Sequence, residues 1–109
     1  MARYLTEEDA AAAGIEIIHE TEAQRFALYR ATDSGSELVG EAHYSFPREG
    51  VVDFDHTVVD DSLRGTGLSG ILAHRAVTSE IARANTVQAS CWFIEGYLAK
   101  HPELLGGAE

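Results

Sequence analysis

The chain has 109 residues, of which 45% are hydrophobic and 24% charged, so it has the size and composition of one globular domain. Its 18 acidic and 8 basic side chains give a formal net charge of −10, which argues against a surface for nucleic acid or an anionic membrane. A single cysteine excludes an internal disulfide, and we see neither a signal-peptide pattern nor a membrane-spanning run, so we expect a cytoplasmic protein.

Residues 1–14 stand apart from the rest of the chain. Thr6 is a suitable N-cap, three acidic residues follow it, and Gly14 could end a helix. The segment is therefore either a short helix or a solvated tail, followed by a single domain over residues 15–109.

Four strand-like stretches come next, separated by turn residues: Ile15–His19, Arg25–Arg30, Glu37–Phe46 and Val51–Val59. They predict an antiparallel meander. Alternation along the fourth stretch puts Phe54, His56 and Val58 on one face and Asp53, Asp55 and Thr57 on the other. We therefore expect His56 to point inward and both aspartates to be solvated.

The spacing of apolar residues changes from a strand pattern to a helix pattern in the second half of the chain. Leu68–Ala84 predicts one helix, apolar on two faces and so packed on both. Thr86–Ser90 predicts a strand and Trp92–Lys100 a short helix, which Pro102 ends. The order gives an α+β fold whose fourth and fifth strands run parallel, because a helix crosses between them.

Between strand and helix lies a loop with three glycines, `LRGTGLSG`. Free backbone N–H groups and a helix dipole at such a position favour phosphate, and Arg64 adds a positive charge. A P-loop would need a lysine that is absent here. Gly65, Gly67 and Gly70 match a dinucleotide fingerprint, but the preceding strands predict an antiparallel sheet. A glycine-rich turn without a ligand stays open.

The stretch `RGTGLS`, with Val59 five residues before its arginine, resembles the acetyl-CoA signature of the GCN5-related N-acetyltransferase (GNAT) superfamily. Together with `HTVVDDSLRGTGLSGIL` and `SCWFIEGYLAKHPE` it is similar to the small YjdJ-like branch, over about residues 40–103. The resemblance implies a mixed, mostly antiparallel sheet with a strand-helix-strand-helix core that binds acetyl-CoA. The usual helices between the first two strands are missing, because only `ETEAQ` joins them.

The same resemblance implies the binding residues. The pantetheine arm would pair with the backbone of Thr57, Val58 and Val59. The pyrophosphate would lie on the loop residues Arg64, Gly65, Thr66, Gly67, Leu68 and Ser69, the last replacing the usual glycine or alanine. The implied reaction moves an acetyl group from acetyl-CoA to an amine in an open cleft, with a protein or peptide among the acceptors. No histidine spacing indicates a metal.

The catalytic side chains are harder to assign. The tyrosine that many superfamily members use as an acid aligns with Leu98. Cys91, before the last helix, could carry the acetyl group, donate a proton or be a buried small side chain. His56 could be a base or a structural histidine. The rival function is a CoA-binding module without turnover, and an NAD-binding fragment is a third.

Overall fold

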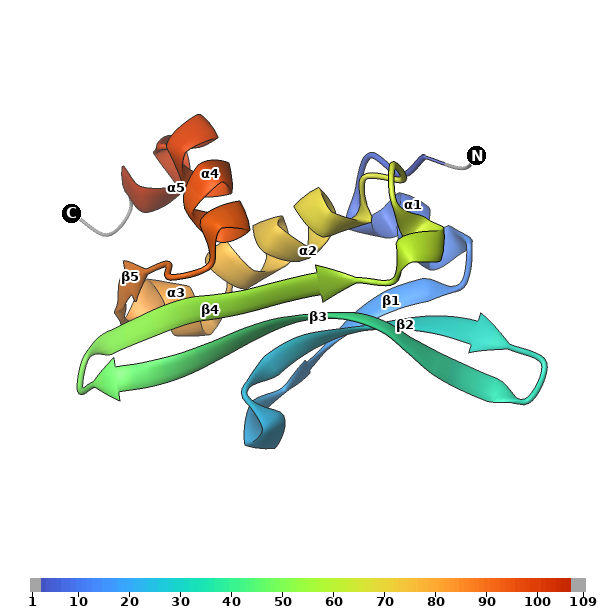
Figure 1. Ribbon diagram of the computed structural model, residues 1–109, viewed down its shortest axis with the longest axis horizontal. Coiled ribbons are helices and arrows are strands. Elements are labelled where there is room, and N and C mark those ends of the chain that lie inside the picture. Colours follow the sequence, from blue (N-terminus) through green and yellow to red (C-terminus); the bar gives the residue numbers. More distant parts are fainter. Residues whose placement is uncertain (1–2, 107–109) are drawn as a thin grey trace.

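The computed structural model describes residues 3–106, which form a five-stranded sheet with helices on one side (Figure 1). The strands are β1 (Ile15–Glu20), β2 (Arg25–Thr32), β3 (Gly35–Arg48), β4 (Val51–Val59) and β5 (Thr86–Gln88). The helices are α1 (Glu7–Ala12), α2 (Leu68–Val77), α3 (Glu80–Ala84), α4 (Trp92–Lys100) and α5 (Glu103–Gly106), with 3-10 turns η1 (Thr21–Ala23) and η2 (Asp61–Leu63).

The sheet follows chain order, β1-β2-β3-β4-β5. The first four strands are antiparallel, and β5 runs parallel to β4 after the crossover through α2 and α3. The predicted α+β fold is confirmed. Between β1 and β2 the chain makes only η1, so the sheet lacks a helical layer at that connection.

The N-terminal segment is helical rather than a tail. The Thr6 hydroxyl accepts a hydrogen bond from the N–H of Asp9 at 3.1 Å, and Gly14 follows the helix with φ of +83°. Glu7 of α1 pairs with Arg75 of α2, which fixes this helix against the domain. The division of the chain at residue 14 stays a prediction.

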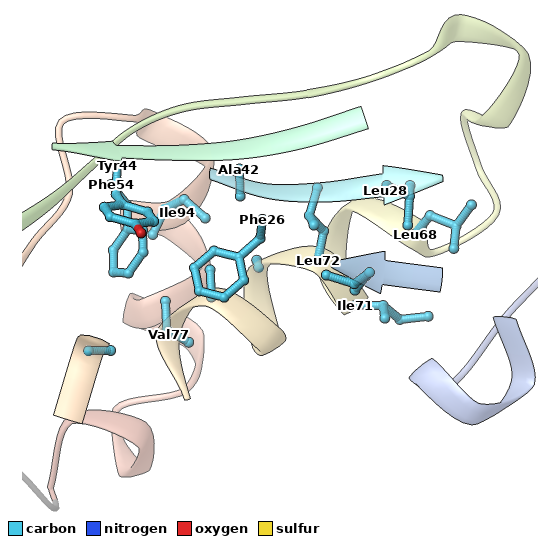
Figure 2. Close-up of a cluster of buried hydrophobic side chains, with 14 of the residues drawn as sticks. Phe26, Leu28, Ala42, Tyr44, Phe54, Leu68, Ile71, Leu72, Val77 and Ile94 are labelled. Carbon is cyan, nitrogen blue, oxygen red and sulfur yellow. The ribbon is translucent and has the colours of Figure 1, made fainter. Parts of the chain in front are cut away.

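The core lies between the sheet and the helices (Figure 2). Phe26, Tyr44 and Phe54 from the strands meet Leu72 and Ile94 from α2 and α4, and all five are less than 2% exposed. Six of the ten residues of α2 are buried, from both of its apolar faces, as the pattern predicted. This packing fixes the start of α2 relative to β4.

The predicted helix over 68–84 is wrong in one respect, because it is two helices. Thr78 donates its hydroxyl to the carbonyl of His74 and so ends α2. Ser79 is extended (φ −72°, ψ 166°) and caps α3 through the N–H of Ala82. The fifth strand is also shorter than predicted, ending at Gln88.

A bulge in β4 changes which residues share a face. Tyr44 pairs with Phe54, but His43 pairs with His56, so Asp55 is an extra residue. Phe54 is buried in the core, whereas His56 is exposed. The alternation predicted for this strand is therefore wrong beyond Phe54: Thr57 and Val59 face the helices, and His56 and Val58 face the other side.

That other side of β1–β4 is the bare face. No helix in the described part of the chain covers it, and Ile18, Leu38 and Val58 are 43–48% exposed there. Figure 1 shows α1, α2 and α4 on the opposite side. Strand β4 therefore has one face against the helices, one bare face, and an edge that leads to β5.

Candidate functional site

The sheet opens between β4 and β5. Register pairs join Val51–Asp53 to Thr86–Gln88, and one more hydrogen bond runs from the N–H of Cys91 to the carbonyl of Phe54 at 3.0 Å. Beyond Phe54 no strand in residues 3–106 covers this edge of β4. From Phe54 to Val59 the open edge is roughly 17 Å long, at about 3.3 Å per residue.

The direction of the β4 backbone decides which groups reach the open edge. The N–H of Asp60 donates to Val39 of β3 at 2.8 Å. Because the direction alternates along a strand, Val58 also turns its N–H and C=O toward β3, and Thr57 and Val59 turn theirs to the open edge. Val58 is therefore not positioned to pair along this edge, unlike its two neighbours.

Thr57 has a further unpaired group. Its Oγ1 is buried and has no hydrogen-bond partner among residues 3–106. A buried hydroxyl without a partner is costly, so such groups point to a ligand or an ordered water. This hydroxyl lies on the helix side of β4, next to the open edge.

The loop after β4 leads directly into α2. Gly65 and Gly67 have φ of +78° and +88°, a region that other residues adopt at a cost. Thr66 is buried; it donates its hydroxyl to the carbonyl of Leu63 and accepts the N–H of Leu68. These bonds join the loop to the turn before it and to the first residue of α2.

The loop carries a row of free donors. No group in residues 3–106 accepts a hydrogen bond from the N–H of Gly65, Gly67, Ser69 or Gly70. The N-cap of α2 is Gly67, which has no side chain to satisfy them. The loop predicted to bind phosphate thus carries free backbone donors at the start of α2, the N–H of Ser69 among them, and phosphate binding stays a prediction.

Arg64 stands at the outer end of this loop. Its side chain is 80% exposed, and its Nε lies 3.0 Å from Asp61. An exposed pair of this kind contributes little, up to about 1 kcal/mol. The guanidinium can therefore exchange that carboxylate for a phosphate at low cost.

A cleft of about 590 Å³ begins at the same loop. Its lining includes Gly67, Gly70 and His74 from the loop and α2, Tyr97 from α4, and residues of the N-terminal segment. A Cβ on Gly70 would meet no other atom within 4 Å. Packing within the protein thus gives no reason for a glycine there.

Gly67 differs, because a Cβ there would lie 2.6 Å from the carbonyl oxygen of Tyr4. The N-terminal segment crosses the loop at this point, and the N–H of Tyr4 donates to Thr66 at 2.7 Å. The bare backbone at Gly67 therefore serves the protein's own packing as well as any ligand.

Cys91 lies at the opposite end of the open edge. It occupies the N-cap position of α4, is partly buried and makes no side-chain capping bond. Its backbone bond to Phe54 fixes it beside β4. The Cys91 side chain thus lies where the sequence predicted it, at the end of the strand-like segment after β5.

Asp53 helps to hold Cys91 in place. Its carboxylate accepts hydrogen bonds from the N–H and the hydroxyl of Ser90, at 2.8 and 2.7 Å. Asp53 is only 7% exposed, so its expected solvation is wrong. Buried carboxylates require such partners, and Ser90 supplies two.

The alternation predicted that His56 points into the protein. In the structure it lies on the bare face instead. Directly across the strands lies His43, whose Nδ1 is 2.9 Å from Asp55, and Ser45 donates to the same carboxylate at 2.9 Å. His43 was missed at the sequence level because the bulge brings Asp55 and His56 to the same side. The signal available was only its position opposite His56.

The helix α4 offers no tyrosine toward the open edge. Leu98 is buried, and Tyr97 packs against His101 with ring centroids 4.4 Å apart. Burial, together with the charge of Glu103, raises the pKa of Tyr97 above its usual value.

A family model described as GCN5-related N-acetyl-transferase matches residues 25–106, from the start of β2 through α5. The chain belongs to the GCN5-related N-acetyltransferase family. The resemblance to this family seen in the sequence is confirmed.

The curated relatives of this chain include Protein NATD1 from Gallus gallus and Protein NATD1 from Mus musculus. Each is 30% identical over 59 residues, which is 54% of this chain and 54% of the relative. Protein NATD1 from Homo sapiens has the same identity over 52% of its length. The match thus spans about half the length of these relatives.

Residues 3–106 hold no group of three or more His, Cys, Asp and Glu side chains that could bind a metal ion. Within the same range, none of the helices has the length and apolar character needed to cross a bilayer.

Proposed function

We propose that this family member is an acetyl-CoA-dependent N-acetyltransferase that transfers the acetyl group to an amine arriving over the bare face. The observation that carries the proposal is the open edge of β4. At one end of it lies the loop with free N–H donors, and at the other lies Cys91. A cytoplasmic location, suited to a lone thiol, is part of the proposal.

The chain's unpaired groups suit acetyl-CoA. The edge-facing N–H and C=O groups of Thr57 and Val59 can pair with the amides of an extended arm, as a neighbouring strand would. The donors from Gly65 to Gly70 suit a pyrophosphate at a helix N-terminus. Thr57 Oγ1 gains a partner when an arm lies along the edge.

The chemistry needs an electrophilic carbonyl and a neutral amine. A backbone N–H on the β4 edge, at Thr57 or Val59, is suited to stabilise the oxyanion that forms when the thioester is attacked. An alkyl amine with pKa near 10.4 must first lose a proton. His56 can accept it from the bare face, and His43, oriented by Asp55, is the second base within that face.

Cys91 has two roles open to it. It can donate a proton to the departing thiolate of CoA. Alternatively its thiolate attacks the thioester, the acetyl–sulfur bond to CoA breaks as the bond to Cys91 forms, and the amine then takes the acetyl group. A cationic acceptor, such as a lysine of a protein, is supported by an excess of negative charge on the bare face, where Glu20 and Glu41 share the one guanidinium of Arg25 and Asp55 pairs with His43.

Calorimetric titration with acetyl-CoA tests the proposal, with CoA and NAD as comparisons. We expect binding that Arg64→Glu abolishes and that Arg48→Glu, at the far end of β3, leaves unchanged. Intact-mass measurement then tests Cys91: a gain of one acetyl group that Cys91→Ala removes indicates a covalent carrier. Absence of binding to both acetyl-CoA and CoA would refute the proposal.

A CoA-binding module without turnover is the second candidate function. It is favoured by Leu98, which puts a buried apolar side chain where relatives with a tyrosine acid carry a hydroxyl. Incubation with acetyl-CoA and a panel of lysine peptides separates the two. Release of CoA that depends on peptide, and that falls in His56→Gln or His43→Gln, supports the enzyme; tight binding without release supports the module.

A further inference from the structure

The cleft that begins at the glycine loop has the N-terminal segment as its second wall. Residues Arg3–Glu7 line one side of it, and Gly67, Gly70, Ile71 and His74 the other. The family match starts only at residue 25, so this wall lies outside the matched part of the chain. The residues of this wall that contact the loop precede the sheet in the chain.

Two backbone contacts fix this wall to the loop. The N–H of Tyr4 donates to the carbonyl of Thr66, and the carbonyl of Tyr4 lies against the Cα of Gly67. Further along, the ion pair between Glu7 and Arg75 joins α1 to α2. The segment is thus held at two points on the loop before α2 and at a third in the last turn of that helix.

Arg3 is the cation that this arrangement brings to the loop. Its Nη1 donates to the carbonyl of Gly65 at 3.3 Å, and the side chain is exposed. No carboxylate in residues 3–106 pairs with it. A guanidinium has five N–H donors, so most remain available beside the free N–H groups of the loop.

The charge of the cleft favours an anion although the whole chain carries −10. The acidic side chain in its lining is Glu7, and the guanidinium of Arg75 neutralises it. His74 is exposed on the same side. Ile71 and Tyr97 add an apolar surface of the kind that a purine ring contacts.

We propose that Arg3 and this cleft bind the nucleotide end of acetyl-CoA, with Arg3 on its phosphates. The inference rests on the proposed function and extends its site to the N-terminal segment. The acetyl end lies along β4, the pyrophosphate lies on the loop, and the segment from Arg3 to Thr6 closes the outer side.

The test measures CoA, dephospho-CoA and pantetheine binding to the unchanged chain and to Arg3→Gln. Arg48→Gln is the matched control, because it makes the same charge change on an exposed residue far along β3. We expect Arg3→Gln to weaken CoA about tenfold, the order of one charge-assisted hydrogen bond. Pantetheine, which has no phosphate, should bind both proteins equally.

The dephospho-CoA titration identifies which phosphate is involved. If Arg3 binds the 3′-phosphate, the unchanged chain prefers CoA to dephospho-CoA and Arg3→Gln loses that preference. If Arg3 binds the pyrophosphate, the variant weakens both ligands alike. Either result supports the proposal. A CoA affinity that falls less steeply with salt in Arg3→Gln than in the unchanged chain also supports it, because salt screens the contact of an exposed cation.

Three results would overturn it. Arg3→Gln binding CoA as tightly as the unchanged chain would remove Arg3 from the site, while leaving the proposed function intact. An equal loss of CoA affinity in Arg48→Gln would show that the net charge of the protein, and not the position of Arg3, causes the weaker binding. Failure of the unchanged chain to bind CoA would refute the proposed function and this inference together.

Discussion

At Gly70, a single substitution should raise the stability of the free protein and lower its affinity for acetyl-CoA. It lies inside α2, and a Cβ there would meet nothing within 4 Å. Gly70→Ala should therefore stabilise the free protein by about 0.5–1 kcal/mol, through helix propensity and a less flexible unfolded chain. For a chain of this size that gain raises the melting temperature by roughly 2–8 °C.

The same methyl group should impair binding, because it occupies the cleft beside the free N–H of Gly70. Crowding of this kind costs about 1–3 kcal/mol, or roughly 5- to 150-fold in the dissociation constant of acetyl-CoA. Thermal unfolding without ligand and calorimetric titration measure the two effects on one protein preparation.

Gly96 provides the matched control. It also lies inside a helix, α4, with nothing within 4 Å of an added Cβ, and it does not line the cleft. Gly96→Ala should stabilise the protein to the same degree and leave acetyl-CoA affinity unchanged. If Gly70→Ala binds acetyl-CoA as tightly as Gly96→Ala does, the argument that a ligand requires bare backbone at Gly70 is refuted.

Three further predictions concern the fold around the site. Gly67→Ala should destabilise by at least about 2 kcal/mol in urea unfolding, because φ is +88° and the Cβ would lie 2.6 Å from a carbonyl oxygen; an unchanged midpoint would contradict this. Asp53→Ala should cost about 1–3 kcal/mol by leaving Ser90 without its acceptor, whereas the exposed Asp33→Ala should be neutral in the same assay. Burial lowers the pKa of His19, so stability is complete above the ordinary value of 6.5 and falls as the pH drops through the lowered pKa; His19→Gln should flatten that part of the pH profile.

Local signals predicted most of the fold. Thr6 and its acidic neighbours made a helix one of two alternatives for the N-terminal segment, and Trp92–Lys100 matches α4 at both ends. The glycines at 65 and 67 indicated a turn between strand and helix, because positive φ is a property of the local chain, whereas the binding residues from Arg64 to Ser69 came from the family resemblance. Such features depend on neighbours a few residues away, which a sequence displays directly.

The errors share a different cause. The bulge at Asp55 arises from pairing between β3 and β4, so alternation within Val51–Val59 could not reveal that His56 changes sides. Asp53 is buried because Ser90, 37 residues later, supplies its donors. The break at Ser79 was more accessible, since a serine before Glu80 is a usual helix start. The errors at His56 and Asp53 therefore arose from contacts between segments that are distant in the chain, which a single sequence does not display.

The short pairing of β5 has a consequence for motion. Three register pairs, the bond from Cys91 to Phe54 and the carboxylate of Asp53 join β5 and α4 to β4. Because β5 is an edge strand with three register pairs, whereas β2 and β3 are paired on both sides, the β5 amides should exchange with deuterium well before those of β2 and β3. A molecule lying along the open edge of β4 would contact both β4 and the segment after β5. The β5 amides would then exchange more slowly, which would reveal binding without an activity assay.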